Sequence, residues 1–220
     1  MSSKAKIAVI GGTGAEGSGL ALRWAAAGHR VTIGSRDAAR ARAAAEGLSA
    51  CLNGASISGD ESLAAAAAAE IVVLTVPYAA QLDTARALAP KLAGKIFVDV
   101  TVPLVPPKVS HVQLPEGGSS VVRVQKELGE GVKVVSAFQN VSAHKLKDLC
   151  HRIACDVLVC SDHKDARLRV IELAADAGLK GIDAGPLANS AAAEAMTSLL
   201  IWINRTYKVP DAGVTITGIP

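Results

Sequence analysis

The sequence predicts an α/β fold: a doubly wound parallel sheet followed by a small C-terminal helical or mixed domain. Three observations support this prediction. Short apolar runs alternate along the 220 residues with helix-like segments. The runs are apolar on both sides, as in strands that helices cover on both faces of a sheet. A G-x-G-x-x-G stretch joins the first run to the first helix-like segment. We expect a first domain of residues 1–137 and a smaller one of residues 138–220.

The first strand, helix and following strand surround the glycine motif, a context that predicts a nucleotide-binding Rossmann-type fold. The strand covers residues 7–10, and the helix ends near Gly28. The motif itself consists of Gly12, Thr13, Gly14, Ala15, Glu16 and Gly17. We expect Gly12 to allow a tight turn, Gly14 to let the backbone approach a pyrophosphate, and Gly17 to bring the helix close to the strand. The helix N-terminus then faces the phosphates.

The second strand ends without the carboxylate that would bind the ribose 2′-hydroxyl of NAD. Instead, Ser35 offers a hydroxyl, Arg36 a planar fork of donors, and Arg40 a second guanidinium one helical turn later. These side chains are suited to a 2′-phosphate and predict NADP(H) as the cofactor. Two alternatives stay open: Arg36, Arg40 and Arg42 form only a solvated helix face with neighbouring acids, or Asp37 replaces the NAD-type acid.

The alternation continues through the middle of the chain. We expect a helix over 60–70, a strand over 71–76, a helix over 78–92, a strand over 95–100, a helix over 121–129 and a strand over 132–138. Because ligands of such sheets bind at the carboxyl ends of the strands, Val76, Pro77 and residues 99–101 are expected to line the site.

The proline- and glycine-rich stretch 102–120 holds no regular element and either covers a substrate or is an exposed connector. The last third predicts a strand over 156–160, a helix over 164–177, a short element over 179–183 and a long helix over 191–207. An apolar stripe on this helix must be buried against the sheet domain or another subunit. Its residues are Ala195, Leu199, Trp202 and Ile203.

The composition excludes several classes of partner. A net charge of +3 without a basic cluster indicates neither a nucleic acid nor a membrane surface, and no run reaches ~18 apolar residues. Residues 1–4 leave no room for a signal peptide, so we expect a cytoplasmic protein. The four cysteines are irregularly spaced, suit a reducing compartment, and are expected to be small buried residues without a metal.

Several short motifs occur together in the order known from one family: Gly11–Gly14 with Gly17, Gly34-Ser35-Arg36, Val76-Pro77, Val135-Ser136-Ala137 and Asp183–Leu187. The chain resembles the F420-dependent NADP oxidoreductases (NADPH-dependent F420 reductases) over nearly its whole length. The resemblance implies hydride transfer between C4 of NADP(H) and C5 of the deazaflavin coenzyme F420. It also implies a homodimer in which the long C-terminal helix closes the site.

The resemblance implies two sets of site residues. NADP(H) would contact the glycine motif, Ser35, Arg36, Arg40, Val76, Pro77 and Ala137. The expected contacts of the second substrate are Tyr78, Phe138, Gln139, Asn140 and Leu187. For Tyr78 the alternative stays open that it is a partly buried helix residue with its hydroxyl in water. No catalytic acid or base is expected, because the cofactor carries the reactive bond and the protein aligns it.

Two residues depart from the family pattern. Gln139 stands in a segment where related archaeal enzymes often have a histidine, so another acceptor (a flavin, a pterin or a small carbonyl compound) stays open, as does a non-catalytic NADPH sensor. Glu16 replaces an apolar residue in the first helical turn, and we expect its side chain to point away from the pyrophosphate.

Overall fold

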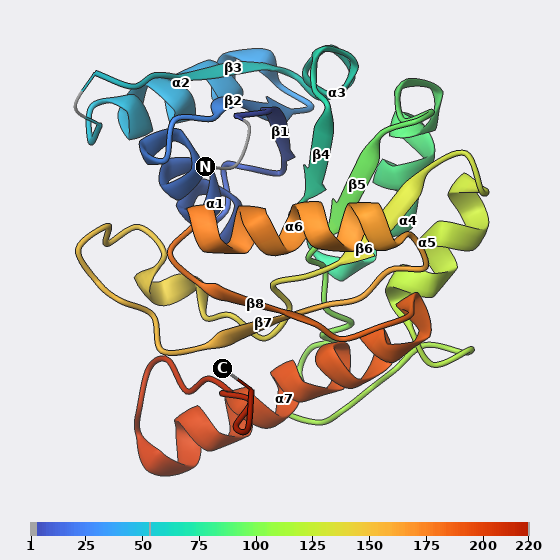
Figure 1. Cartoon of the computed structure of the whole chain (residues 1–220). Helices are drawn as coiled ribbons and strands as arrows, with labels where there is room; N and C mark the ends of the chain where they lie inside the picture. Colours follow the sequence, from blue (N-terminus) through green and yellow to red (C-terminus); the bar gives the residue numbers. More distant parts are fainter. Residues whose placement is uncertain (1–3, 53, 220) are drawn as a thin grey trace.

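The computed structural model describes residues 4–52 and 54–219 (Figure 1). Its centre is a six-stranded sheet in the order β3-β2-β1-β4-β5-β6, with every pair parallel. The strands are β1 Lys6–Ile10, β2 Arg30–Ser35, β3 Ile57–Glu61, β4 Ile71–Leu74, β5 Ile96–Asp99 and β6 Lys133–Ser136. The strand order reverses between β1 and β4, which creates the crevice where ligands of doubly wound sheets bind. The predicted fold class is confirmed.

Helices cover both faces of this sheet. They are α1 Ala15–Ala26, α2 Ala38–Ser49, α3 Ser62–Ala68, α4 Tyr78–Leu88, α5 Ser120–Leu128 and α6 Lys164–Asp176. Successive residues of a strand point to opposite faces, so Ile7 and Val9 enter the core beneath α1 while Ala8 and Ile10 enter the core beneath α3 and α4. This double burial explains why the strands are continuously apolar.

The prediction of one helix over 60–70 is wrong at its start. Residues 57–61 form the edge strand β3, and α3 begins only at Ser62. The Glu61 side chain ends the strand by accepting the Leu63 N–H at 2.9 Å as the N-cap of α3. The strand contains a single buried apolar residue, Ile57, so it lacks the alternating pattern by which strands are recognised.

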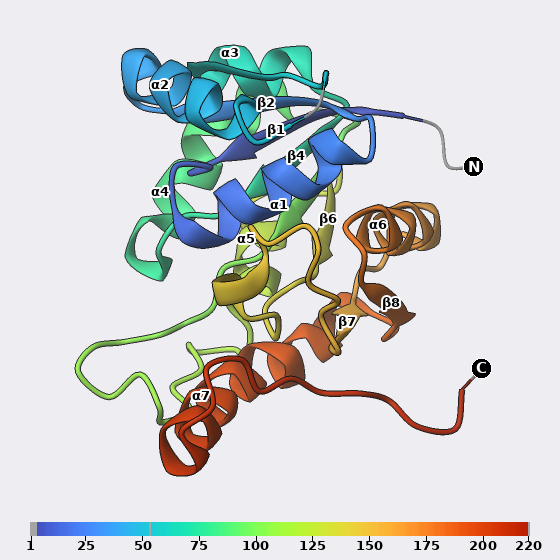
Figure 2. The same ribbon diagram turned by 90° about the vertical axis from the view of Figure 1, so that its left-hand side faces the viewer.

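A second layer follows β6 (Figure 2). Strands β7 Asp156–Val159 and β8 Lys180–Asp183 form a small parallel sheet that lies between α6 and the long helix α7 Ser190–Tyr207. Backbone hydrogen bonds of 2.9 Å in both directions between Ser136 and Cys160 connect β6 to this layer. Three short 3-10 helices complete the chain: η1 Ala89–Lys91, η2 Ala143–Lys145 and η3 Leu187–Asn189.

The stretch between β5 and α5 runs beside α7 (Figures 1 and 2). The His111 ring meets the Trp202 ring edge to face at 6.3 Å, and Arg205 donates to the Ser110 hydroxyl at 3.2 Å. Within α7 the predicted apolar stripe is not buried on the sheet domain: Leu199 and Trp202 are each 54% exposed. The buried side of α7 includes Glu194 and Ser198 instead.

All four cysteines are free. Cys155 and Cys160 are buried as expected, whereas Cys51 and Cys150 are exposed, so the prediction of buried cysteines is wrong for half of them. Burial raises the pKa of the Cys160 thiol to about 11.

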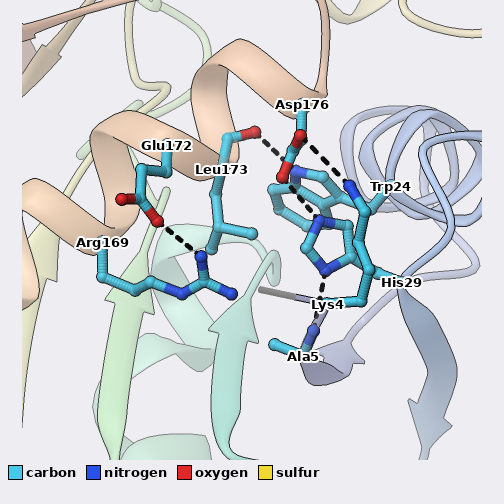
Figure 3. Close-up of polar contacts among 8 residues, drawn as sticks. All are labelled: Lys4, Ala5, Trp24, His29, Arg169, Glu172, Leu173 and Asp176. Carbon is cyan, nitrogen blue, oxygen red and sulfur yellow. Dashed lines mark hydrogen bonds and ion pairs between the residues drawn. The ribbon is translucent and has the colours of Figure 1, made fainter. Parts of the chain in front are cut away.

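A buried histidine joins the start of β1 to α6 (Figure 3). The His29 Nδ1 atom accepts the Ala5 N–H at 3.1 Å, and Nε2 lies 2.8 Å from the Asp176 carboxylate. Nδ1 must be unprotonated to accept, so the neutral ring donates from Nε2. Beside it the Trp24 indole N–H donates to the Leu173 carbonyl at 2.9 Å. Burial lowers the pKa of His29, although the Asp176 carboxylate opposes this effect.

Acidification is therefore expected to weaken the fold through His29. In the unfolded chain this histidine binds a proton near its ordinary pKa of about 6.5. In the folded chain its pKa is lowered, so it binds the proton only at lower pH. The free energy of unfolding should thus fall as pH drops below that value, by at most about 1.4 kcal/mol per pH unit from this residue. Urea unfolding between pH 7.5 and 5 checks it: His29→Gln should flatten the slope, and His144→Gln, at an exposed histidine, should not. An unchanged slope in His29→Gln would contradict this role.

Candidate functional site

The loop between β1 and α1 is shaped by close contacts with its neighbours. Gly11 has a φ of +81°, and its N–H donates to the Gly34 carbonyl at 3.0 Å. The residue with a left-handed backbone is thus Gly11, which directly precedes the predicted motif. Gly12 is restricted by space: a Cβ atom there would lie 2.9 Å from the Val9 carbonyl oxygen.

The next two glycines differ in what surrounds them. At Gly17 a Cβ atom would collide with the Thr75 hydroxyl and lie 2.8 Å from the Gly12 Cα atom, so α1 starts in direct contact with the loop. At Gly14 a Cβ atom would meet only the Gly11 carbonyl oxygen, at 3.5 Å. Gly14 is the exposed N-cap of α1, and no side chain caps this helix. The loop thus presents open backbone and free helix N–H groups to an anion.

Two arginines follow β2: Arg36 directly after the strand, and Arg40 in the first turn of α2. Arg36 and Arg40 are exposed, and within the described ranges no hydrogen bond or ion pair engages either guanidinium. Asp37 is occupied as the N-cap of α2, because its Oδ1 accepts the Ala39 N–H at 2.9 Å and the Arg40 N–H at 3.2 Å. Its own N–H donates to the Ser35 hydroxyl at 3.3 Å. This geometry leaves the arginines available for a phosphate.

The ends of β4 and β5 form the next part of the rim. The Thr75 hydroxyl donates to the Ile10 carbonyl at 2.9 Å, which ties this end to β1. Val76 is half-buried against Gly11, and Pro77 is the exposed N-cap of α4. The Thr101 hydroxyl donates to the Val76 carbonyl at 3.4 Å.

The chain leaves β6 through Ala137 and Phe138, both buried. The Ala137 N–H donates to the Asp99 carbonyl at 3.4 Å. Phe138 has a φ of +73°, rare for a residue with a side chain, and its ring packs edge to face on Trp24 at 5.8 Å. The Phe138 side chain is therefore part of the core, which the sequence did not reveal.

The side-chain amides of Gln139 and Asn140 follow Phe138, and each uses its nitrogen as a donor within the fold. Gln139 Nε2 donates to the Asp99 carbonyl at 2.7 Å, and Asn140 Nδ2 donates to the Asp156 carbonyl at 2.6 Å. These bonds fix the orientation of both amides. Gln139 Oε1 and Asn140 Oδ1 are buried, and neither has a hydrogen-bond partner among the residues that the structure describes. A buried oxygen without a hydrogen bond destabilises the folded protein unless a water molecule or a ligand donates to it.

Helix α7 lies against this segment. Gln139, Asn140, Thr197 and Asn204 are among the residues around a cavity of about 100 Å³. The Thr197 hydroxyl donates to the Gln139 carbonyl at 2.6 Å. Sequence reasoning missed Thr197.

Two buried carboxylates, Asp99 at the end of β5 and Glu194 on α7, accept hydrogen bonds near the site. Asp99 accepts Gln81 Nε2 at 2.7 Å and the Thr101 N–H at 2.9 Å, and burial raises its pKa to about 6. Glu194 of α7 accepts the Ser119 hydroxyl at 2.6 Å and the Ser120 N–H at 2.7 Å, so it caps α5. Sequence reasoning missed Gln81 and Glu194; a lone acid in the apolar start of α7 was the available signal.

Tyr78 and Leu187 do not line the cavity around Gln139 and Asn140. Tyr78 lines a cavity of about 230 Å³ between α4 and α5, and its hydroxyl accepts from Arg123 at 3.4 Å. Leu187 is buried in the core on the α4 and α5 side of the sheet.

Glu16 lies in the first turn of α1 and is half-buried. Its Oε1 atom is enclosed without a hydrogen-bond partner, and burial raises the pKa of its carboxyl to about 8.

Of the residues that the structure describes, no three His, Cys, Asp or Glu side chains come close enough to share a metal ion. No helix in the same ranges has both the length and the apolar character needed to cross a membrane.

Comparisons with known proteins show what the chain is similar to. The family model described as NADP oxidoreductase, coenzyme F420-dependent, matches residues 6–103. The F420-dependent NADP reductase of Methanothermobacter thermautotrophicus is 42% identical over 98% of this chain and 96% of its own length. The enzyme of the same name from Methanocaldococcus jannaschii is 40% identical over 97% and 99%. A crystal structure from Arthrobacter sp. FB24, provisionally described as an F420-dependent NADP reductase, superposes with a TM-score of 0.80 at 30% identity, over 97% of this chain and 100% of that one.

Proposed function

This chain belongs to the F420-dependent NADP oxidoreductases, and from that premise we propose that it transfers a hydride between NADP(H) and the deazaflavin coenzyme F420. The observation that carries the proposal is the similarity to the Methanothermobacter thermautotrophicus reductase over 98% of this chain. A match of that extent includes the segments after β6 as well as the nucleotide-binding half.

For NADP(H), the proposed contacts follow the rim from the glycine loop to β6. The open backbone at Gly14 receives the pyrophosphate, and the unengaged Arg36 and Arg40 with Ser35 hold the 2′-phosphate. The full proposed set is Gly12, Thr13, Gly14, Ala15, Glu16, Gly17, Ser35, Arg36, Arg40, Val76, Pro77 and Ala137.

For F420, we propose that the Gln139 and Asn140 amides contribute the contacts, because their buried oxygens lack partners in the fold alone. Phe138 contributes through its backbone, since its ring packs on Trp24. Tyr78 and Leu187 complete the proposed set for F420. The two coenzymes supply the chemistry, in which a hydride passes between nicotinamide and deazaflavin. The chain holds and aligns the rings, so no acid or base is assigned.

The proposal is tested by offering NADPH to the purified protein with F420, a free flavin or a pterin. Rapid oxidation with F420 alone is the expected result. Gln139→Ala should raise the KM for F420 more than the KM for NADPH. Oxidation only with another acceptor would overturn the assignment of F420, and NADPH binding without turnover would favour a sensor.

Arg36→Ala is expected to weaken NADPH binding by about 1–3 kcal/mol, since a charge-assisted pair with the 2′-phosphate is lost. NADH binding should be nearly unchanged, because NADH has no phosphate at that position. Fluorescence titration with both nucleotides measures the difference. Arg42→Ala, at an exposed arginine on α2, is the matched control and should alter neither affinity. Equal losses for NADPH and NADH in Arg36→Ala would refute this role.

We also propose a homodimer formed through α7. The apolar stripe predicted from the sequence remains open in one copy, with Leu199 and Trp202 each 54% exposed. A second copy of this surface would bury both. Light scattering should give twice the mass of one chain, and Trp202→Glu should give a monomer. A monomeric native protein would contradict the proposal.

We further propose a division into two domains, small-molecule partners and a cytoplasmic location. The division into residues 1–137 and 138–220 is supported by the end of the large sheet at Ser136. Small molecules are the expected partners rather than nucleic acid, given the net charge of +3. The four free cysteines suit a cytoplasmic location.

A further inference from the structure

Glu16 is an unusual residue for a loop that binds a pyrophosphate. A carboxylate beside two phosphate groups repels them, and the field of a helix N-terminus only partly offsets this repulsion. The Glu16 Oε1 atom is nevertheless enclosed and without a hydrogen-bond partner. Within residues 4–52 and 54–219, no cation forms an ion pair with this carboxyl.

The direction of the side chain follows from the helix. Glu16, Gly19 and Arg23 share one face of α1, because residues three, four and seven positions apart are aligned. A Cβ atom on Gly19 would collide with Leu146, and Arg23 donates to the Leu146 carbonyl at 2.7 Å. This face therefore lies under the segment that follows η2 (Figure 2). Glu16 is its first residue, at the end of α1 that meets the glycine loop.

The charged groups around this face do not pair with Glu16. On α1 the other one is Arg23, whose guanidinium donates to backbone carbonyls. The covering segment carries His144, Lys145, Lys147 and Asp148, and the only carboxylate among them accepts backbone N–H groups at 3.1 and 3.2 Å. Residues 75–77 and 136–142 contain no charged side chain. On α6, Asp176 is bonded to His29 at the other end of α1.

We propose that Glu16, in the first turn of α1 beside the glycine loop, must be an uncharged acid when NADP(H) binds, so that ionisation of this one carboxyl weakens NADP(H) binding. The inference rests on the proposed function, because it requires the nucleotide in the glycine loop. The raised pKa of Glu16, about 8, places the change just above neutral pH. Binding favours the neutral form, so the cofactor holds the proton on Glu16 and affinity is lost as pH rises.

The test is a set of NADPH titrations at pH 7, 8 and 9, at constant ionic strength, following nucleotide fluorescence. The dissociation constant of the native protein should rise about tenfold between pH 7 and pH 9, as expected for one group with a pKa of about 8 that must be protonated. In Glu16→Gln it should change less than about twofold over this range. Glu46→Gln, which removes an exposed carboxylate on α2, should keep the native rise.

The outcomes separate this inference from the function it rests on. A pH-independent dissociation constant in the native protein, or an equal rise in Glu16→Gln, would overturn the role of Glu16 and leave NADPH binding intact. Failure of the native protein to bind NADPH at pH 7 would overturn the proposed function and this inference with it. Glu16→Leu gives a second uncharged variant, and its binding should also be independent of pH.

Discussion

Replacing Gly17 with Ala is expected to lower the free energy of unfolding by about 3 kcal/mol, at the upper end of the usual cost of overpacking. The added methyl group would collide with the Thr75 hydroxyl and lie 2.8 Å from the Gly12 Cα atom. Relief requires α1 to move away from the loop, which would also displace the N–H groups that face the phosphates. Urea unfolding measures the first effect, and NADPH titration of the folded protein should show little remaining affinity.

Gly14→Ala is the matched comparison, because the same methyl group has room in the fold. Its nearest neighbour would be the Gly11 carbonyl oxygen at 3.5 Å. We expect a loss of unfolding free energy of about 1 kcal/mol or less, from the poorer N-cap. NADPH affinity should nevertheless fall by about 1.4 kcal/mol or more, a factor of at least ten, because the methyl group occupies the space of the pyrophosphate. Unchanged NADPH binding in Gly14→Ala would contradict this position of the cofactor, and a stable Gly17→Ala protein would contradict the packing argument.

Replacing Arg23 with Met is expected to cost about 3–5 kcal/mol, comparable to breaking a buried charged network. Arg23 is 6% exposed, and its guanidinium donates to the carbonyls of Leu146, Ala177 and Asp148 at 2.7, 3.0 and 2.7 Å. Methionine fills similar space but offers no donor, so these carbonyls lose their partner. The residues after η2 would then detach from α1.

Chemical unfolding of Arg23→Met measures this cost, with Arg30→Met, at an exposed arginine, as the control. Arg23→Lys should recover only part of the stability, since a single ammonium group cannot reach carbonyls in several directions as the guanidinium fork does. A loss below about 1 kcal/mol in Arg23→Met would show that water replaces the guanidinium without penalty.

The nucleotide-binding half could be predicted because its signals are local. One short stretch of sequence is enough to predict each of its features: the continuous apolar strands, the glycine loop, and the strand end followed by Arg36. The edge strand β3 was missed because its pairing depends on β2 and α2, and its own residues carry almost no apolar pattern. The positive φ of Gly11 was not predicted, and a Cβ atom there would lie 2.9 Å from the Thr75 carbonyl oxygen, a contact between distant segments.

The second half of the site depended on contacts that the sequence does not display. The left-handed backbone of Phe138 turns its ring onto Trp24, so a residue that looked available for a ligand belongs to the core. Glu194 and Thr197 act at the site only because α7 crosses the ends of α5 and β6. The roles of Gln139 and Asn140 toward F420 remain predictions.

The central claim is that a hydride passes directly between NADP(H) and F420. The most direct measurement uses NADPH carrying deuterium at one of the two C4 positions, each in turn, with F420 as the acceptor and mass spectrometry of the reduced F420 as the readout. We expect one of the two labelled cofactors, and only one, to place its deuterium on F420, because a fixed site presents a single face of the nicotinamide. Reduced F420 without label from either cofactor, or no reduction of F420 at all, would contradict the account.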